Sequence, residues 1–178
     1  MKKITTVLVL FVAAVMFTSC NNKQTLQEYL VESQEKTGFM TFDIPVNFFQ
    51  PKSDQVSEEV MATIKSIRKI NVVGLPFKNN EEIYEAEKAA MKEIFKDADK
   101  YKSLMSVKVQ GYNVKLYYTG NSDAIDEVIA FGYAKEQGVG IARILGDDMN
   151  PSLIIKMLDQ IKMDGSGMNL NQFTKAFK

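Results

Sequence analysis

Histidine and tryptophan are absent from this 178-residue sequence, and cysteine occurs once, as Cys20. The chain therefore lacks an imidazole for general-base catalysis, a histidine–cysteine cluster for zinc, and the second thiol that a disulfide needs. Basic and acidic residues both number 22, so the cationic excess of nucleic-acid-binding domains is missing and we expect no nucleic-acid partner. Hydrophobic residues make up 46% and charged residues 25%, which is typical of a folded globular chain and excludes a disordered or fibrous one.

The first twenty residues resemble the signal sequence of a bacterial lipoprotein. Two lysines precede an unbroken apolar run at residues 7–17. As a helix this run spans about 16 Å, roughly half of a 30 Å hydrocarbon core, so a secretory signal is favoured over a membrane-spanning helix. Phe17-Thr18-Ser19-Cys20 resembles a lipobox, although leucine is commoner at the position of Phe17. We expect residues 1–19 to be removed by cleavage between Ser19 and Cys20, and Cys20 to carry the lipid. The alternatives are a secreted protein and an uncleaved signal anchor.

The residues after Cys20 indicate to which membrane of the cell envelope the protein is sorted. Asn21 replaces the aspartate of inner-membrane retention signals, and no acidic cluster follows, unlike the export signals of surface lipoproteins. We therefore expect an envelope protein at the outer membrane, facing the periplasm. Residues 20–25 form a polar tether, in which five residues extend about 17 Å at most, so the domain would lie close to the lipid.

Helical and extended patterns alternate in the first half of the mature chain. Apolar spacing predicts a helix over 26–34, a second beginning at residues 53–54 and a third capped by Asn80. Residues 39–44 and 70–75 are rich in β-branched and aromatic residues and predict strands. The expected inward stripes of the three helices are Leu26, Tyr29, Leu30 and Ser33; Val56, Val60, Ile64 and Ile67; and Ile83, Ala90, Met91, Ile94, Phe95 and Ala98.

The second half predicts two hairpins and a helix. Alternating apolar residues at 105–109 and 112–118 indicate a first hairpin with one solvated face. Residues 127–133 and 139–145 indicate a second hairpin. Asn150-Pro151 is typical of a helix start. The inward residues expected in that last helix are Ile154, Met157, Leu158 and Ile161.

Together these elements predict an α+β fold, with a largely antiparallel sheet of about six strands and three to four helices mainly on one face. Because no repeat or low-complexity linker interrupts residues 26–163, we expect a single domain there. Residues 164–178 are expected to be a flexible tail, with a short amphipathic segment formed by Leu170, Phe173 and Phe177. That segment would dock on its own domain, or bind a partner or lipid.

Several short segments carry a resemblance to one family. They are Leu26-Gln27-Glu28-Tyr29, Gly38-Phe39 to Asp43-Ile44-Pro45, Glu127-Val128, and Ile144-Leu145-Gly146-Asp147 with the closing helix. They resemble the predicted lipoproteins of Bacteroidota that carry the domain of unknown function 4252. The likeness covers nearly all of the mature chain. The family has no assigned activity, so the resemblance implies no catalytic residue.

Four carboxylates are candidates for acid–base or ligand chemistry: Asp43, Glu127, Asp147 and Asp148. A glycosidase needs two carboxylates about 5 to 10 Å apart across a cleft. Such a pair would make the protein a carboxylate-dependent hydrolase acting on envelope or dietary glycans. The simpler interpretation of Asp147 and Asp148 is turn formation and helix-start charge before Asn150. We expect no metal site and no cofactor.

Two other patterns have simple structural explanations. Ser33 to Lys36 matches S-x-x-K and Lys36-Thr37-Gly38 matches K-T-G, but penicillin-recognising serine enzymes keep these motifs far apart, whereas here they share Lys36. A lysine stripe on the third helix could bind anions, yet acidic residues three positions earlier would neutralise most of it. The lysines are Lys88, Lys92, Lys96 and Lys100, and the acids are Glu85, Glu93 and Asp97.

The function expected from the sequence is therefore non-enzymatic. We expect a lipid-anchored envelope protein that works by binding or sensing, with an envelope protein as its partner. Anchoring to a surface raises the effective concentration of weak contacts, which suits such a module.

Overall fold

The computed structural model describes residues 23–44, 49–51, 57–109, 111–150, 152–154 and 161–163. The signal peptide, Cys20, the caps expected at residues 53–54, the inward positions of Met157 and Leu158, and the tail at 164–178 lie outside the described residues.

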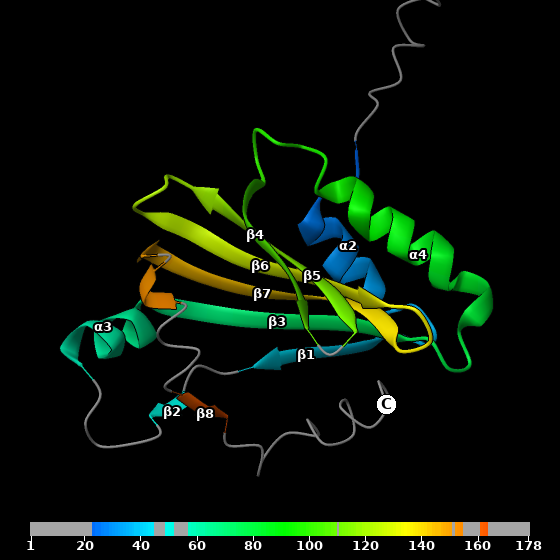
Figure 1. The fold of residues 1–178 in the computed structure, drawn as a ribbon, viewed down its shortest axis with the longest axis horizontal. Coiled ribbons are helices and arrows are strands. Elements are labelled where there is room, and N and C mark those ends of the chain that lie inside the picture. Colours follow the sequence, from blue (N-terminus) through cyan, green and yellow to red (C-terminus); the bar gives the residue numbers. More distant parts are fainter. Residues whose placement is uncertain are drawn as a thin grey trace, which may run out of the picture.

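The protein is built on a six-stranded antiparallel sheet with the order β1-β3-β7-β6-β5-β4 (Figure 1). A separate antiparallel pair joins β2 to β8. This architecture confirms the predicted α+β class and the largely antiparallel sheet. The described elements are α2 (Leu26–Ser33), β1 (Met40–Ile44), β2 (Phe49–Pro51), α3 (Glu58–Ser66), β3 (Ile67–Pro76), α4 (Glu81–Ile94), β4 (Lys102–Val109), β5 (Tyr112–Gly120), β6 (Ile125–Ala134), β7 (Gly138–Met149) and β8 (Ile161–Met163).

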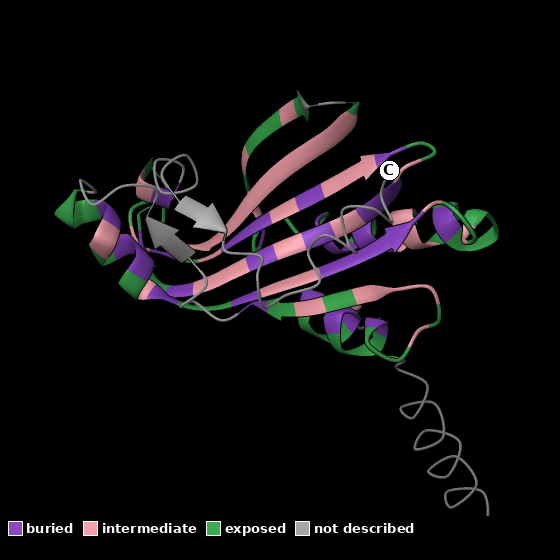
Figure 2. Cartoon of the chain, turned by 90° about the horizontal axis from the view of Figure 1, so that it is seen from below, coloured by how far each residue is buried: buried purple, intermediate pink, exposed green. Residues whose placement is uncertain are grey.

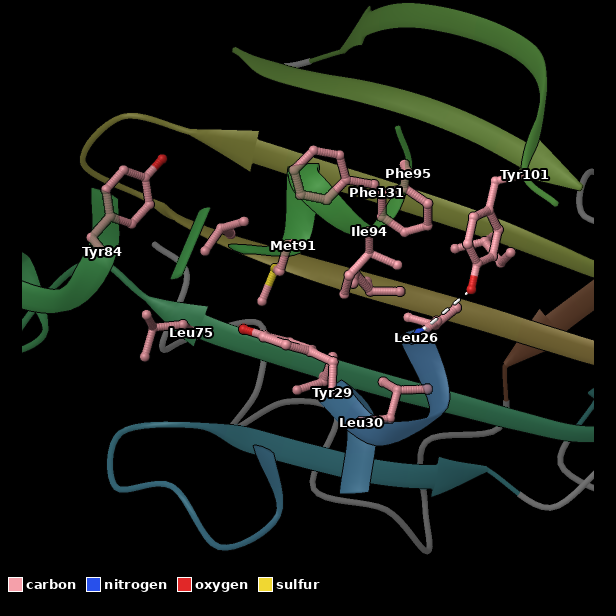
Figure 3. Close-up of a cluster of buried hydrophobic side chains, with 14 residues drawn as sticks. Leu26, Tyr29, Leu30, Leu75, Tyr84, Met91, Ile94, Phe95, Tyr101 and Phe131 are labelled. Atoms are coloured by element: carbon pink, nitrogen blue, oxygen red, sulfur yellow. Dashed lines mark hydrogen bonds between the residues drawn. The ribbon is translucent and has the colours of Figure 1, made fainter. Parts of the chain in front are cut away.

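Helices α2 and α4 lie on the same face of the sheet and enclose the larger core (Figures 1 and 3). Phe95 is central to it, since its ring stacks on Tyr117 at 4.6 Å and lies 5.5 Å from Phe131. The backbone N–H of Leu26 donates to the Tyr101 hydroxyl, which ties the start of α2 to the chain after α4. The buried members are Leu26, Tyr29, Leu30, Val73, Leu75, Tyr84, Met91, Ile94, Phe95, Tyr101, Ile129, Phe131, Val139 and Ile141.

A second core cluster lies at the other end of the sheet, where α3 packs. Val60 and Ile64 of α3 contact residues such as Ile70 and Val128, which alternate along their strands with the residues of the larger core. Because successive strand residues point to opposite faces, α3 covers the face opposite α2 and α4. The sheet therefore separates two hydrophobic clusters.

Helix α2 begins where a capping box satisfies its first amides. The Thr25 hydroxyl accepts from the N–H of Glu28, and the Glu28 carboxylate accepts from the N–H of Thr25. These bonds hold the pKa of Glu28 below its ordinary value. The inward stripe predicted for this helix is confirmed in full. Thr25, which the sequence placed in the tether, is thus part of the folded domain.

Helix α3 differs from its prediction at both ends. Its N-cap is Ser57, whose hydroxyl accepts from the N–H of Val60. It ends at Ser66, and Ile67 already belongs to β3. Ile67 is buried as expected, but as a strand residue. The prediction extended one apolar repeat too far because Ile67 falls in helical register while being strongly β-forming.

Helix α4 has the predicted inward face at Met91, Ile94 and Phe95, which are buried, but its first turn differs from the prediction. Ile83 is 40% exposed, whereas the neighbouring Tyr84 is 1% exposed and donates to the carbonyl of Ala134. Tyr84 lies seven residues before Met91, so it completes the buried stripe. The helix also ends at Ile94, which leaves the exposed Ala98 beyond it.

Two further expectations are corrected. Asn150 caps a helical turn as predicted, since its side chain accepts from the N–H groups of Ser152 and Leu153, but Ile161 lies in β8 and not in a helix. The first hairpin was expected to have one solvated face, yet Tyr117, which alternates with the apolar residues of β5, stacks on Phe95 at the end of α4. Every residue of β5 is of intermediate exposure, so neither face of this strand is fully solvated.

Candidate functional site

A row of polar side chains crosses the sheet beside α2. Asp43 of β1 pairs in register with Asn71 of β3, and Asn71 pairs with Arg143 of β7. Glu127 of β6 lies diagonally beside Arg143, because it pairs with Leu145. Strand alternation places these side chains on the face that carries α2, where they interrupt an otherwise apolar surface.

Arg143 is the centre of this row. It is 7% exposed, and its guanidinium forms a bidentate pair with Glu127 through contacts of 2.5 and 3.2 Å. A third N–H group donates to the side chain of Gln27 on α2 at 2.6 Å. The arrangement satisfies a charge that would otherwise be costly to bury. It also fastens α2 to the sheet.

Asp43 and Asp147 each have a partner nearer the surface. Asp43 contacts Lys69 at 2.9 Å and accepts a hydrogen bond from Asn71. Asp147 contacts Arg68 at 3.3 Å, with both side chains more than half exposed. Such exposed pairs contribute only about 0–1 kcal/mol. These cations can therefore exchange partners at little cost.

Asp148 stands apart from the row. Its φ of 48° places it in the left-handed region, which aspartate tolerates better than most side chains. Both Asp147 and Asp148 lie within β7, beside an irregularity in its pairing with β6, and not in a separate turn as predicted. They precede Met149, which ends the strand immediately before the cap at Asn150.

Two shallow depressions, each of about 250 Å³, flank α2 and share Leu30, Gln34 and Asn71. The first lies between α2 and β1, and its lining includes Asp43. The lining of the second contains three cations and no acidic residue. The residues of this basic depression are Gln27, Leu30, Val31, Gln34, Arg68, Lys69, Asn71, Arg143 and Leu145.

The four candidate acids do not form a facing pair in either depression. Only Asp43 lines one of them, whereas Glu127, Asp147 and Asp148 line neither. Glu127 forms an ion pair with Arg143, and Asp147 lies near the C-terminal end of β7 beside Arg68. A glycosidase needs two carboxylates facing a common cleft. Asp43, Glu127 and Asp147 lie on three different strands, and each pairs with a basic residue of its own.

The S-x-x-K motif is part of the packing of α2. The hydroxyl of Ser33 is buried and donates to the Tyr29 carbonyl at 2.7 Å. Lys36 pairs with Glu87 of α4 at 3.0 Å, and the Tyr29 hydroxyl donates to the same carboxylate at 2.7 Å. Burial, reinforced by the bond to Glu87, raises the pKa of Tyr29 above its ordinary value of 10.0.

This shift gives Tyr29 a testable effect on alkaline stability. The folded state binds the phenol proton more tightly than the unfolded state, so the stabilisation is complete below pH 10 and is lost as the pH rises above it. We expect Tyr29→Phe to reduce the alkaline loss of stability by up to about 1.4 kcal/mol per pH unit. Urea unfolding between pH 9 and 11 measures this. Equal pH slopes for the two proteins would contradict it.

The lysine stripe is only partly helical. Lys88 pairs with Glu85 at 2.6 Å and Lys96 with Glu93 at 2.5 Å, as predicted, but Lys96 and Lys100 lie beyond the end of α4. Within the described residues, no group of three or more acidic, thiol or imidazole side chains is arranged to hold a metal ion. Likewise, no described helix is long and apolar enough to cross a bilayer.

A family model for a domain of unknown function, DUF4252, matches residues 29–157, which is more than half of the chain. The chain belongs to this family. Neither the curated proteins nor the solved structures contain a match.

In this DUF4252 domain, Arg143 and Gln27 organise the row, and neither residue was a candidate from the sequence alone. A signal for Arg143 was present. It is the only charged residue in the run from Val139 to Leu145, and a charge inside an apolar strand needs a buried partner. The partnership with Gln27 joins residues 116 positions apart, so local patterns carry no sign of it.

Proposed function

We propose that this protein is a non-enzymatic, lipid-anchored envelope protein that acts by binding another envelope protein at the periplasmic surface of the outer membrane. The anchor is Cys20, supported by the lipobox-like segment that precedes it. The observation that supports binding is the basic depression beside α2. The cations that line it are paired with neighbouring carboxylates. They form a charged surface that a partner protein can complement, and not a group of catalytic residues.

The short tether supports a role at the membrane. Thr25 caps α2, so only the residues between Cys20 and Thr25 can act as a spacer. Their extended reach is about 17 Å. The described chain begins on the side of the sheet that carries α2 and α4 (Figure 1). This side of the domain would therefore face neighbours at the lipid surface.

The chemistry of the basic depression defines the partner. Arg68 and Lys69 form exposed ion pairs with Asp147 and Asp43, and such pairs contribute little to stability. A carboxylate from a partner can therefore replace either aspartate. Val31, 53% exposed, provides an apolar contact at the rim. The partner segment is acidic, with an apolar side chain next to the acid.

The size of the depression favours a protein partner over a free small molecule. Sites that enclose small ligands usually measure about 300–1,000 Å³ and are mostly apolar. The basic depression measures about 250 Å³ and is lined largely by charged and amide side chains. Its dimensions suit one or two side chains of a partner surface.

The anchor has a direct test. We expect Cys20→Ala to abolish incorporation of an alkynyl palmitate analogue into the protein in growing cells, because Cys20 is the only cysteine. Immunoprecipitation followed by fluorescent detection measures the label. Label that persists in the variant would contradict lipidation at Cys20.

Charge reversal tests partner binding. We expect Arg68→Glu combined with Lys69→Glu to remove most of the complexes trapped by formaldehyde in intact cells, because the basic depression becomes acidic. Lys92→Glu combined with Lys96→Glu is the matched control, since it makes the same change in charge on the exposed side of α4 and beyond its end. The proposal fails if both double variants retain the complexes, or if the wild-type protein is recovered only as a monomer.

A further inference from the structure

The basic depression adjoins a depression of the opposite charge, the one between α2 and β1. The two share Leu30 and Gln34 of α2 and Asn71 of β3, so they form one groove beside this helix. Among the described residues that line the second depression, Asp43 is the only charged one. We call it the acidic depression, and Thr41, Phe42 and Val72 are also in its lining. The groove therefore has an acid at one end and cations at the other.

A β-bulge brings two of the cations to the basic end. The pairing of β3 with β7 shifts between Ile67 and Lys69, so Arg68 is the extra residue. Ile67 and Ile70 both belong to the core cluster that contains α3, although regular alternation would put residues three positions apart on opposite faces. The bulge therefore allows Arg68 and Lys69, which are consecutive in sequence, to line one depression. Bulges next to functional sites commonly redirect side chains in this way.

Arg143 is the buried cation of the basic end. Its side chain is 9% exposed, and hydrogen bonds to Glu127 and Gln27 use three of its N–H groups. A guanidinium has further N–H donors, which can bind an acceptor that enters the depression. The fixed position of this side chain distinguishes the basic end from a set of mobile surface lysines.

The ion pair between Lys69 and Asp43 joins the two ends of the groove. The contact measures 2.9 Å, and both side chains are more than half exposed. A carboxylate that binds Lys69 in place of Asp43 leaves this aspartate without its cation. A ligand that carries only an acid thus adds negative charge beside an unpaired carboxylate, which is unfavourable. A ligand that also carries a base restores the pairing at both ends.

We propose that the groove binds an extended segment of the partner that carries a basic side chain close to its acidic one. The acid contacts the cations of the basic depression, and the base contacts Asp43. Asp43 and Arg143 lie in one row on β1 and β7, two strand spacings or about 10 Å apart. Side chains two residues apart in an extended segment point to the same side and are about 7 Å apart, and a long basic side chain covers the difference. The expected pattern is therefore an acid and a base separated by one residue.

The groove is open on the side from which such a segment would enter. β1 is at the edge of the six-stranded sheet, and within the described part of the chain no strand pairs with its outer side. Its residues from Met40 to Asp43 are exposed or half-buried, as the green and pink stretches of this strand show in Figure 2. The proposal rests on the proposed function, because it specifies the partner that binds at the same site.

Asp43→Asn distinguishes this partner from one that carries only an acid, through the direction of the effect. A diazirine amino acid at Val31 reports partner binding in intact cells as the yield of the photo-adduct. Because the substitution removes an acid, the groove becomes more positive, and a purely acidic segment would bind equally well or better. We expect instead a yield about threefold lower, since the base of the partner loses its contact. Asp43→Glu should restore the yield.

Asp147→Asn is the matched control. It also removes an aspartate from an exposed pair with a cation of the basic depression, but Asp147 lines neither depression. We expect an unchanged or higher yield. The proposal is overturned if Asp43→Asn leaves the yield unchanged or raises it, or if the two variants lower it equally. In those cases, loss of the adduct in Arg68→Glu with Lys69→Glu would still support the proposed function, whereas its retention there would contradict both.

The adduct itself gives a second test that needs no substitution in the groove. Mass spectrometry of the cross-linked peptide identifies the partner segment. We expect an acidic and a basic residue separated by one position in it. A segment with an acid and no base within a few residues would overturn the proposal and leave the proposed function standing.

Discussion

Glu127→Ala is expected to lower the free energy of unfolding by about 3–5 kcal/mol, the range found when one partner of a buried ion pair is removed. Arg143 and Glu127 have side chains that are 9% and 17% exposed, so the guanidinium would remain buried without its carboxylate. Gln27 alone cannot compensate for the charge. Urea-induced unfolding at neutral pH measures the loss.

The matched control for this prediction is Asp147→Ala. Asp147 also contacts an arginine, but both side chains are more than half exposed, so we expect a change within about 1 kcal/mol. A double replacement of Glu127 and Arg143 by methionine should recover much of the loss, because no unpaired charge remains. Equal losses of stability from Glu127→Ala and Asp147→Ala would contradict the prediction. They would show that the buried Glu127–Arg143 pair contributes no more to stability than the exposed Asp147–Arg68 pair.

Phe131→Ala is expected to cost about 3–5 kcal/mol of unfolding free energy, typical for a large aromatic side chain removed from a core. Phe131 is 1% exposed and lies between Phe95 and Tyr133, with ring centroids 5.5 and 5.4 Å away. Removing it leaves a cavity where α4 meets β6. Thermal and urea unfolding both report the loss.

Ile83→Ala is the control on the same side of the sheet. Ile83 is equally apolar in sequence but 40% exposed on α4, so its truncation should change stability by about 0.5 kcal/mol or less. A loss for Ile83→Ala as large as that for Phe131→Ala would mean that Ile83 packs inward, as the sequence predicted, contrary to the structure.

The sequence predicted the elements well where periodicity and turn chemistry agree. The stripe of α2, the two hairpins and the start of α4 at Asn80 all follow from local patterns. The burial of Tyr84 in place of Ile83 could not be predicted, because it depends on a tertiary contact. Tyr84 is buried through its bond to the Ala134 carbonyl, fifty residues away.

Even so, the candidate site was predicted only in part. Asp43 and Glu127 were identified as acids of interest, but their partners decide what they do. Glu127 is bound to Arg143, and strand register across four strands of the sheet brings these groups into one row. Register is a property of the assembled sheet, so a search for catalytic spacings along the chain cannot find it.

The most direct test of partner binding through the basic depression is photo-cross-linking in intact cells from a diazirine amino acid placed at Val31. Ile83 is the control position, because it is another exposed apolar residue, on α4. The proposed function predicts an adduct with an acidic segment of one envelope protein from position 31 alone. Arg68→Glu with Lys69→Glu should abolish this adduct. Only free monomer, or the same adducts from positions 31 and 83, would contradict the proposal.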